Sequence, residues 1–213
     1  KFRGIVLRLC FDPVICSKAV LSEAVEIAKA AGFDAIVLHC VKTASSPFHP
    51  DTSVRVIRKL LDEVGVTLAG LNIRNLTGLN DKGEVNPAFS LRQVEWDIHL
   101  ARALRLSCAN FIGGPRTDES REAVVDGVNT LLEDIPDVTL NVGNSANTCL
   151  ESAADFGALM PELPERAHIW LNATQMADAV KVVDAFADRV GFVTIGADGG
   201  DVVRALKASG YDG

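Results

Sequence analysis

Short runs of apolar, often β-branched residues alternate along this chain with longer runs in which apolar residues recur every three or four positions. The short runs have the length and composition of buried strands, and the longer ones predict amphipathic helices that cover them. Seven strand–helix units follow one another in this way. The strands are expected at residues 4–10, 34–40, 66–72, 108–112, 138–142, 168–172 and 190–195.

Two of the predicted helices carry start signals. Asn86 has the residue type of an N-cap, and Pro87 follows it in the first turn. Thr148 and Glu151 have the spacing of a capping box. The helices are expected over residues 18–31 and 52–64, from 86, over 119–133, from 148, around Met176, Val180 and Val183, and over 200–209.

Strands that are almost wholly apolar and joined by helices predict a parallel sheet that is covered on its outside. Seven units of about 30 residues each favour an α/β fold of the (β/α)₈ TIM-barrel type, formed by residues 1–213 as a single domain, over an open doubly wound sheet. The chain has neither a GxGxxG sequence after its first strand nor a P-loop motif. The count is one short, because the eighth strand is missing from this chain. We expect further residues or another chain to cover the two exposed edges.

Charge and cysteine usage narrow the function classes. A net charge of −7 argues against general binding of nucleic acid or of an anionic membrane surface, since both need a basic face. No apolar stretch is long enough to span a membrane. The five cysteines are widely spaced and form no CxxC pair, which predicts reduced thiols in a cytoplasmic protein.

Three segments carry a resemblance to a known family. They are AKAAGFDAIVL at residues 28–38, HLARALRLSCANFIGGP at 99–115 and GGDVVRALKASGYDG at 199–213. In these segments the chain resembles the xylose isomerase-like TIM-barrel superfamily, which includes sugar phosphate isomerases and epimerases and the family 2 type of AP endonuclease. The resemblance implies a divalent metal bound by Glu, Asp and His at the carboxyl ends of the strands. Such an ion polarises a sugar carbonyl while carboxylates exchange protons.

The sequence departs from the family pattern at every metal-ligand position that can be placed. One further glutamate of the pattern falls beyond residue 213. Without carboxylates beside them, neutral amides are poor ligands for a divalent ion. We therefore expect a degenerate site with no metal and no other cofactor. The placed positions are occupied here by Val37, Gly143, Asn172, Gln175, Thr194 and Ala197.

Polar residues nonetheless follow each strand, where ligands of this fold bind. One interpretation is a pocket of neutral donors and acceptors in which Arg8, Arg74 or Arg116 grips an anionic group. The other is that these residues only cap loops and helices at the rim. The ligand-binding candidates are Arg8, His39, Asn72, Arg74, Asn110, Arg116, Asn144, Asn172, Gln175 and Asp198, and Asp12, Asn75, Asn141 and Thr194 lie near them.

Three functions remain open, and the residues do not decide whether the chain is an enzyme. The first is a sugar phosphate isomerase/epimerase-like barrel that binds a small polar or anionic ligand, such as a sugar, a sugar phosphate or a small acid, without a metal. The second is a non-catalytic scaffold or a subunit of a larger assembly, as a homo-oligomer or with a partner chain. The third is an active isomerase or epimerase that draws missing groups from beyond residue 213 or from a partner. An AP endonuclease is set aside, because its zinc cluster and basic groove have no counterpart here.

Overall fold

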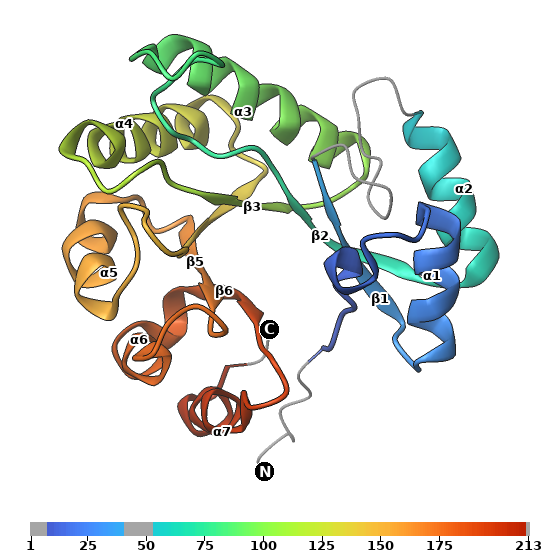
Figure 1. Ribbon diagram of the computed structural model, residues 1–213. Helices are drawn as coiled ribbons and strands as arrows, with labels where there is room; N and C mark the ends of the chain where they lie inside the picture. Colours follow the sequence, from blue (N-terminus) through green and yellow to red (C-terminus); the bar gives the residue numbers. More distant parts are fainter. Residues whose placement is uncertain (1–7, 41–52, 212–213) are drawn as a thin grey trace.

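The protein is described by a computed structural model, in which residues 8–40 and 53–211 are placed. Six parallel strands form one sheet in chain order, each hydrogen-bonded to the next. Seen along the strands, the sheet curves into an arc with the helices on its outer side, the architecture of a partial TIM barrel (Figure 1). The strands are β1 (Ala35–His39), β2 (Thr67–Asn72), β3 (Cys108–Ile112), β4 (Thr139–Gly143), β5 (Ala167–Asn172) and β6 (Val190–Thr194).

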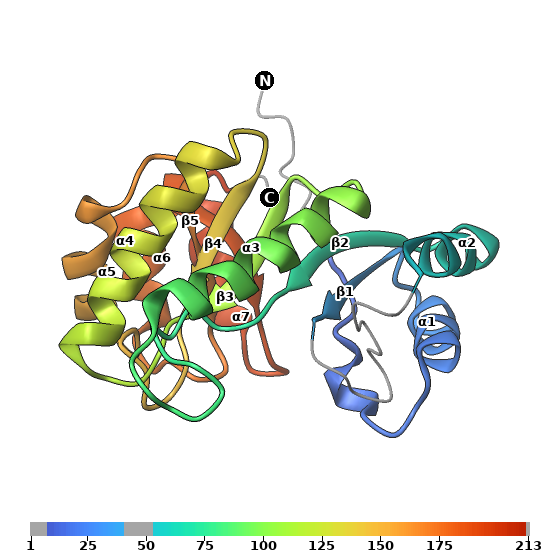
Figure 2. The same cartoon turned by 90° about the horizontal axis from the view of Figure 1, so that it is seen from above.

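Seven α-helices alternate with the strands of the described residues. At the β1 end of the arc, α1 and α2 lie side by side, apart from the helices that cover the other strands (Figure 2). Left-handed glycines, Gly65 and Gly210, end α2 and α7, where a side chain would strain the backbone. The helices are α1 (Leu21–Ala30), α2 (Val54–Val64), α3 (Pro87–Ala103), α4 (Asp118–Asp134), α5 (Ala153–Leu159), α6 (Ala179–Phe186) and α7 (Gly200–Ser209).

The start of α3 is as expected, whereas the starts of two later helices differ. The Asn86 side chain accepts a hydrogen bond from the Phe89 amide, and Pro87 occupies the first helical position. The capping box expected at residues 148–151 is wrong: the box is formed by Ser152 and Asp155, three residues apart, and α5 begins after Ser152. The residues from 174 to 178 form turns, so α6 starts later than the apolar pattern suggests, although Met176 is buried.

The apolar core lies between the strands and the helices. Alternate strand residues point outward to it, among them Leu38, Phe111 and Val142, all of which are buried completely. The other residues of each strand face the interior of the arc, where polar and aromatic side chains such as Asn110 and Trp170 lie together with a few apolar ones such as Val37. The outer side of the sheet therefore has an apolar core, and the candidate site lies on the inner side, among polar and aromatic residues.

The first strand expected, at residues 4–10, falls partly outside the described residues. Its described part, residues 8–10, has no regular structure, and the chain joins the sheet only by one bridge, between Phe11 and Ile36. Within the described residues β6 pairs with β5 alone, and no pairing joins β6 to β1. The arc is therefore open between residues 8–12 and β6, as a barrel with a strand missing would be.

Candidate functional site

A row of polar side chains crosses the interior of the sheet. Strand register places His39, Asn72, Asn110 and Asn141 side by side on four neighbouring strands. The Asn141 amide donates to Asn110 Oδ1 over 2.6 Å, and the Asn110 amide donates to Asn72 Oδ1 over 2.8 Å. The Asn72 amide lies 3.3 Å from His39 Nε2. All three asparagines are buried, so each bond is protected from water and costly to break.

Asp12 ends this row at the carboxyl end of the strands. Its Oδ1 atom lies 2.8 Å from His39 Nε2 and accepts a hydrogen bond of 3.0 Å from the Val14 amide. The second bond arises because Asp12 is the N-cap of a short 3₁₀ helix, Pro13–Cys16. Asp12 and His39 keep 26% and 19% of their side chains exposed, so this end of the row, unlike the asparagines, reaches solvent. A carboxylate paired with an imidazole can accept or hold a proton.

At its other end the row begins with an unpartnered atom. Asn141 Oδ1 is buried and accepts no hydrogen bond from the residues that the structure describes. It lies against Gly191 of β6, where a Cβ atom would come within 2.4 Å of it. Gly191 is thus needed for the row to fit beneath β6. Along the row, each asparagine amide nitrogen points toward the His39 end.

An indole ring occupies the place where the family resemblance puts a metal-binding glutamate. A Cβ atom at Gly143 would lie 2.6 Å from Trp170 Cε3, since the Trp170 ring packs directly over this glycine. The ring is held by a hydrogen bond of 2.9 Å from its Nε1 atom to Thr194 Oγ1. A side chain of any size at residue 143 requires the indole to move.

Two asparagines at the rim join the ends of β4 and β5. The buried Asn144 amide donates to the backbone oxygen of Asn172, and its oxygen accepts from the backbone N–H of the same residue, at 3.0 and 2.7 Å. The Asn172 side chain in turn accepts from the Thr174 hydroxyl at 2.7 Å. Gln175 accepts from Ser145 at 2.9 Å and is exposed. Asn144 and Asn172 therefore have bonds that stabilise the rim, while Gln175 lies at its surface.

Arg74 is held by α3. Its Nε and Nη2 atoms donate to the two carboxylate oxygens of Asp97 at 2.8 and 2.7 Å, and Nη1 donates to Gln93. Asp97 is almost fully buried, and its hydrogen bonds raise the pKa of Arg74 above the ordinary value. This ion pair neutralises the guanidinium charge, so Arg74 fixes the loop after β2 to α3 in this structure.

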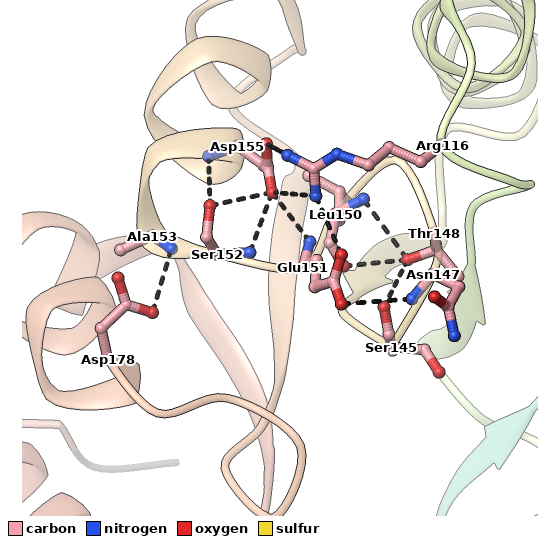
Figure 3. Close-up of polar contacts among 10 residues, drawn as sticks. All are labelled: Arg116, Ser145, Asn147, Thr148, Leu150, Glu151, Ser152, Ala153, Asp155 and Asp178. Atoms are coloured by element: carbon pink, nitrogen blue, oxygen red, sulfur yellow. Dashed lines mark hydrogen bonds and ion pairs between the residues drawn. The ribbon is translucent and has the colours of Figure 1, made fainter.

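Arg116 is similarly engaged, by carboxylates at the start of α5 (Figure 3). Its guanidinium lies 2.9 Å from Glu151 and 3.2 Å from Asp155. Although burial opposes the shift, hydrogen bonds from the Glu151 and Ser152 amides and the charge of Arg116 lower the pKa of Asp155. The network stabilises the first turn of α5 on the loop after β3 and leaves Arg116 half exposed.

Two other candidates lie away from the row. Arg8 donates to Thr67 at the start of β2, so its guanidinium lies toward the amino ends of the strands and not at the rim where we expected it. Asp198 is exposed in the loop between β6 and α7. Of the ten predicted residues, the structure brings together His39, Asn72 and Asn110 in one network.

A cavity of about 420 Å³ lies in the open seam between residues 8–12 and β6. Most of its lining is apolar and includes Phe192, whose ring lies 3.4 Å from the position that a Cβ would take at Gly70. Its polar lining residues include Arg8, Asp12, Thr194 and Tyr211. Burial raises the pKa of the Cys10 thiol, which also lines the cavity, to about 11, so this thiol is neutral at pH 7. The volume is in the range of a small-molecule site.

The described residues contain no cluster of three or more His, Cys, Asp or Glu side chains that could hold a metal ion. Nor does the described part of the chain contain a helix long and apolar enough to cross a membrane.

The sequence model of the xylose isomerase-like TIM barrel matches residues 25–173, well over half of the chain. The chain belongs to the xylose isomerase-like TIM-barrel family. No curated protein matches it. The segment at residues 28–38 and the succession of strand–helix units therefore indicated the family and the fold correctly.

Solved structures of this family share the fold at low identity. A xylose isomerase domain-containing protein from Salmonella typhimurium is 15% identical, with a TM-score of 0.74 over 97% of this chain and 86% of the other. A D-tagatose 3-epimerase-like protein is 14% identical, with a TM-score of 0.72 over 97% and 88%. A xylose isomerase-like TIM-barrel protein from Mycobacterium smegmatis, solved in complex with magnesium, is 12% identical, with a TM-score of 0.68 over 92% and 76%.

Two features of this family member had no recognisable sequence signal. Trp170 belongs to an apolar strand, and nothing in its neighbourhood indicates that it covers Gly143. The link between Asp12 and His39 joins residues 27 positions apart, and only the strand arrangement brings them together. Asn72, Asn110 and Asn141 each follow apolar strand residues, so their common position could be inferred from the parallel register, but their mutual bonding could not.

Proposed function

We propose that this protein is a sugar phosphate isomerase/epimerase-like TIM barrel that binds a small polar ligand at the carboxyl ends of its strands without a divalent metal. The site comprises Asp12, His39 and the asparagine row behind them. His39 and Asp12 supply exchangeable hydrogen-bonding groups at the solvent end of a rigid network. Rigid polar groups beside an otherwise apolar cavity are typical of ligand sites.

The packing of Trp170 over Gly143 is the observation that carries this proposal. A metal site of the family type needs a carboxylate at residue 143, and here even a methyl group would meet the indole ring. Loss of the carboxylate is thus accompanied by filling of the space that it would occupy. An ion held only by amides would lack the anionic oxygen ligands that divalent cations favour.

The arginines support a neutral ligand better than an anionic one. Arg74 and Arg116 are each paired with carboxylates, so an incoming phosphate would have to compete with Asp97, or with Glu151 and Asp155. Replacing such a partner forfeits existing charge-assisted hydrogen bonds. We therefore favour sugars and related hydroxyl compounds over sugar phosphates.

Metal analysis is the first test. The purified protein is equilibrated with Mn²⁺, Zn²⁺ or Mg²⁺, passed through a desalting column and analysed by mass spectrometry of the elements. We expect less than one tenth of an ion per chain, and a stoichiometric ion would refute the metal-free site.

Ligand binding is the second test. Thermal shifts with sugars, sugar phosphates and small acids are compared for the wild type, His39→Gln and the matched control His99→Gln, whose imidazole lies on the exposed face of α3. We expect a neutral sugar to stabilise the wild type and His99→Gln but not His39→Gln. If no compound stabilises the wild type, the scaffold function becomes the better explanation.

The proposal also includes a reducing, cytoplasmic location. All five cysteines lie within the described residues, and all are free thiols. Burial raises the pKa of Cys108 and of Cys149, which keeps both protonated and unreactive at neutral pH.

A further inference from the structure

A groove lies between α3, α4 and the loop that follows β2. Its volume is about 540 Å³, and its lining comes from residues 76–91 and 115–130. The two helices lie side by side there (Figure 1). Neither Asp12, His39 nor any asparagine of the row lines this groove, so it is separate from the site proposed above. Its volume is nonetheless that of a small-molecule site.

The apolar side of the groove is already formed. Leu79 and Val85 pair across a short hairpin, inside which the Asn80 side chain accepts two backbone amides at 2.9 and 3.0 Å. The Ser90 hydroxyl of α3 accepts two more, at 3.1 and 3.2 Å, from the start of this loop. Val85 is nevertheless 69% exposed. A ligand therefore meets an apolar surface that needs no rearrangement, which lowers the cost of binding.

One face of α4 forms the opposite wall and carries negative charge. Glu119, Glu122 and Asp126 all line the groove, at intervals of three and four residues. On a helix, such residues are neighbours with Cβ atoms about 5–6 Å apart. No lysine or arginine lines the groove, and none of these carboxylates forms an ion pair with any residue that the structure describes. The wall is thus a row of negative charges that no cation of the protein neutralises.

We propose that this groove binds a linear polyamine. The ammonium groups of the ligand pair with Glu119, Glu122 and Asp126, and its methylene segments lie on Leu79 and Val85. Nitrogens that are three or four methylene groups apart repeat at about the spacing of the carboxylates. Each ammonium donates hydrogen bonds and accepts none, which matches a wall of acceptors. A metal ion has no apolar body, and an anion would be repelled, so neither fits both walls.

Isothermal titration calorimetry at low ionic strength tests the proposal with spermidine, whose nitrogens are separated by three and by four methylene groups. The matched probe is hexaamminecobalt(III), a compact ion of the same charge without methylene groups. We expect one spermidine to bind per chain, at least about fivefold tighter than the cobalt complex, because only spermidine buries apolar surface and reaches several carboxylates.

Two double variants separate the groove from the net charge. Glu122→Gln/Asp126→Asn removes two carboxylates from the groove, and Glu133→Gln/Asp134→Asn removes two exposed ones from the far end of the same helix. We expect the first to weaken spermidine binding about five- to twentyfold and the second at most about twofold. Val85→Ser, which removes apolar contact but no charge, should weaken it about two- to fivefold. Circular dichroism confirms that each variant is folded.

Four results would overturn the proposal: no saturable binding of spermidine, equal losses in the two double variants, equal or tighter binding of hexaamminecobalt(III), or unchanged affinity in folded Val85→Ser. A leucine–lysine tetrapeptide that binds more tightly than spermidine would instead assign the groove to a basic segment of a partner protein. A dimer in sedimentation that Val85→Ser dissociates would assign it to a second copy of this chain. None of these results bears on the metal-free site, which is tested with divalent ions and sugars.

Discussion

Replacing Gly143 by alanine tests the packing that separates this barrel from a metal-binding one. The added methyl carbon would lie 2.6 Å from Trp170 Cε3 and 3.0 Å from Cδ2, against roughly 3.5–4.0 Å for an ordinary carbon–carbon contact. Gly143 does not have a positive φ, so alanine brings no backbone strain of its own. Overpacking of a rigid interior costs about 1–3 kcal/mol, and we expect Gly143→Ala to lower the free energy of unfolding by that amount.

A double-mutant cycle with Trp170→Leu isolates this contact. Trp170→Leu alone should destabilise the protein by about 3 kcal/mol, because a buried ring and its bond to Thr194 are lost. In that background Gly143→Ala should cost clearly less, since the ring is gone and a strand glycine is itself unfavourable by roughly 0.5–1 kcal/mol relative to alanine. The added methyl carbon would still lie 3.2 Å from the Phe111 backbone oxygen, which keeps a small cost.

Urea unfolding followed by circular dichroism at 222 nm measures all four proteins, so the lost indole does not remove the signal. The expected coupling energy is about 1–3 kcal/mol. Our reasoning is refuted if Gly143→Ala leaves the wild type unchanged, or costs the same with and without Trp170.

Three further predictions concern the neighbouring networks. Asn110→Leu should lower the free energy of unfolding, measured in urea, by about 2–4 kcal/mol, because the buried amides of Asn72 and Asn141 lose their hydrogen-bond partner. A loss below about 0.5 kcal/mol would show that these buried hydrogen bonds do not stabilise the fold. Arg74→Met should lower the free energy of unfolding by about 3–5 kcal/mol in the same assay, since the buried Asp97 carboxylate is left without a cation. Ligand affinity should not change, and a lost thermal shift with ligand would instead place Arg74 in the site. Burial and the charge of Arg189 lower the pKa of His168 below 6.5, so the unfolded chain binds a proton at His168 more readily than the folded one. The free energy of unfolding should therefore fall as the pH drops from about 7 to 5. A pH profile equally steep in His168→Gln would show that another group is responsible.

The alternation of strands and helices could be predicted from the sequence, because each element has its own periodicity. The strand at Cys108–Ile112 and the helix at Gly200–Ser209 agree with the expected bounds residue for residue. Helix starts were less predictable where two caps compete. Thr148 lies three residues before an acid, as Ser152 does, but the Thr148 hydroxyl bonds to the Ser145 and Leu150 carbonyls in a tight loop. Only Ser152 is free to cap α5.

The polar residues at the strand ends could be predicted as a set, but not their individual bonds. Register alone brings Asn72 and Asn110 together, because parallel strands align their residues laterally. Arg74 differs, since its partner Asp97 lies 23 residues away on the buried face of α3. A buried aspartate on a helix is the one signal that could have indicated this pair, because an acid in such a place needs a cation.

The interior of this barrel is filled by pairs of large and small residues that face one another. Trp170 packs over Gly143, and the Phe192 ring lies 3.4 Å from the position a Cβ would take at Gly70. The Trp170 ring therefore depends on a glycine of β4, whereas a Cβ at residue 70 of β2 would make an ordinary contact with the Phe192 ring. A glutamate introduced at residue 143 alone would meet the indole before it reached an ion. Recovery of a family-type metal site would thus require Trp170 to change together with Gly143. This fold can hold either a carboxylate at residue 143 or the indole ring of residue 170 in that space, but not both.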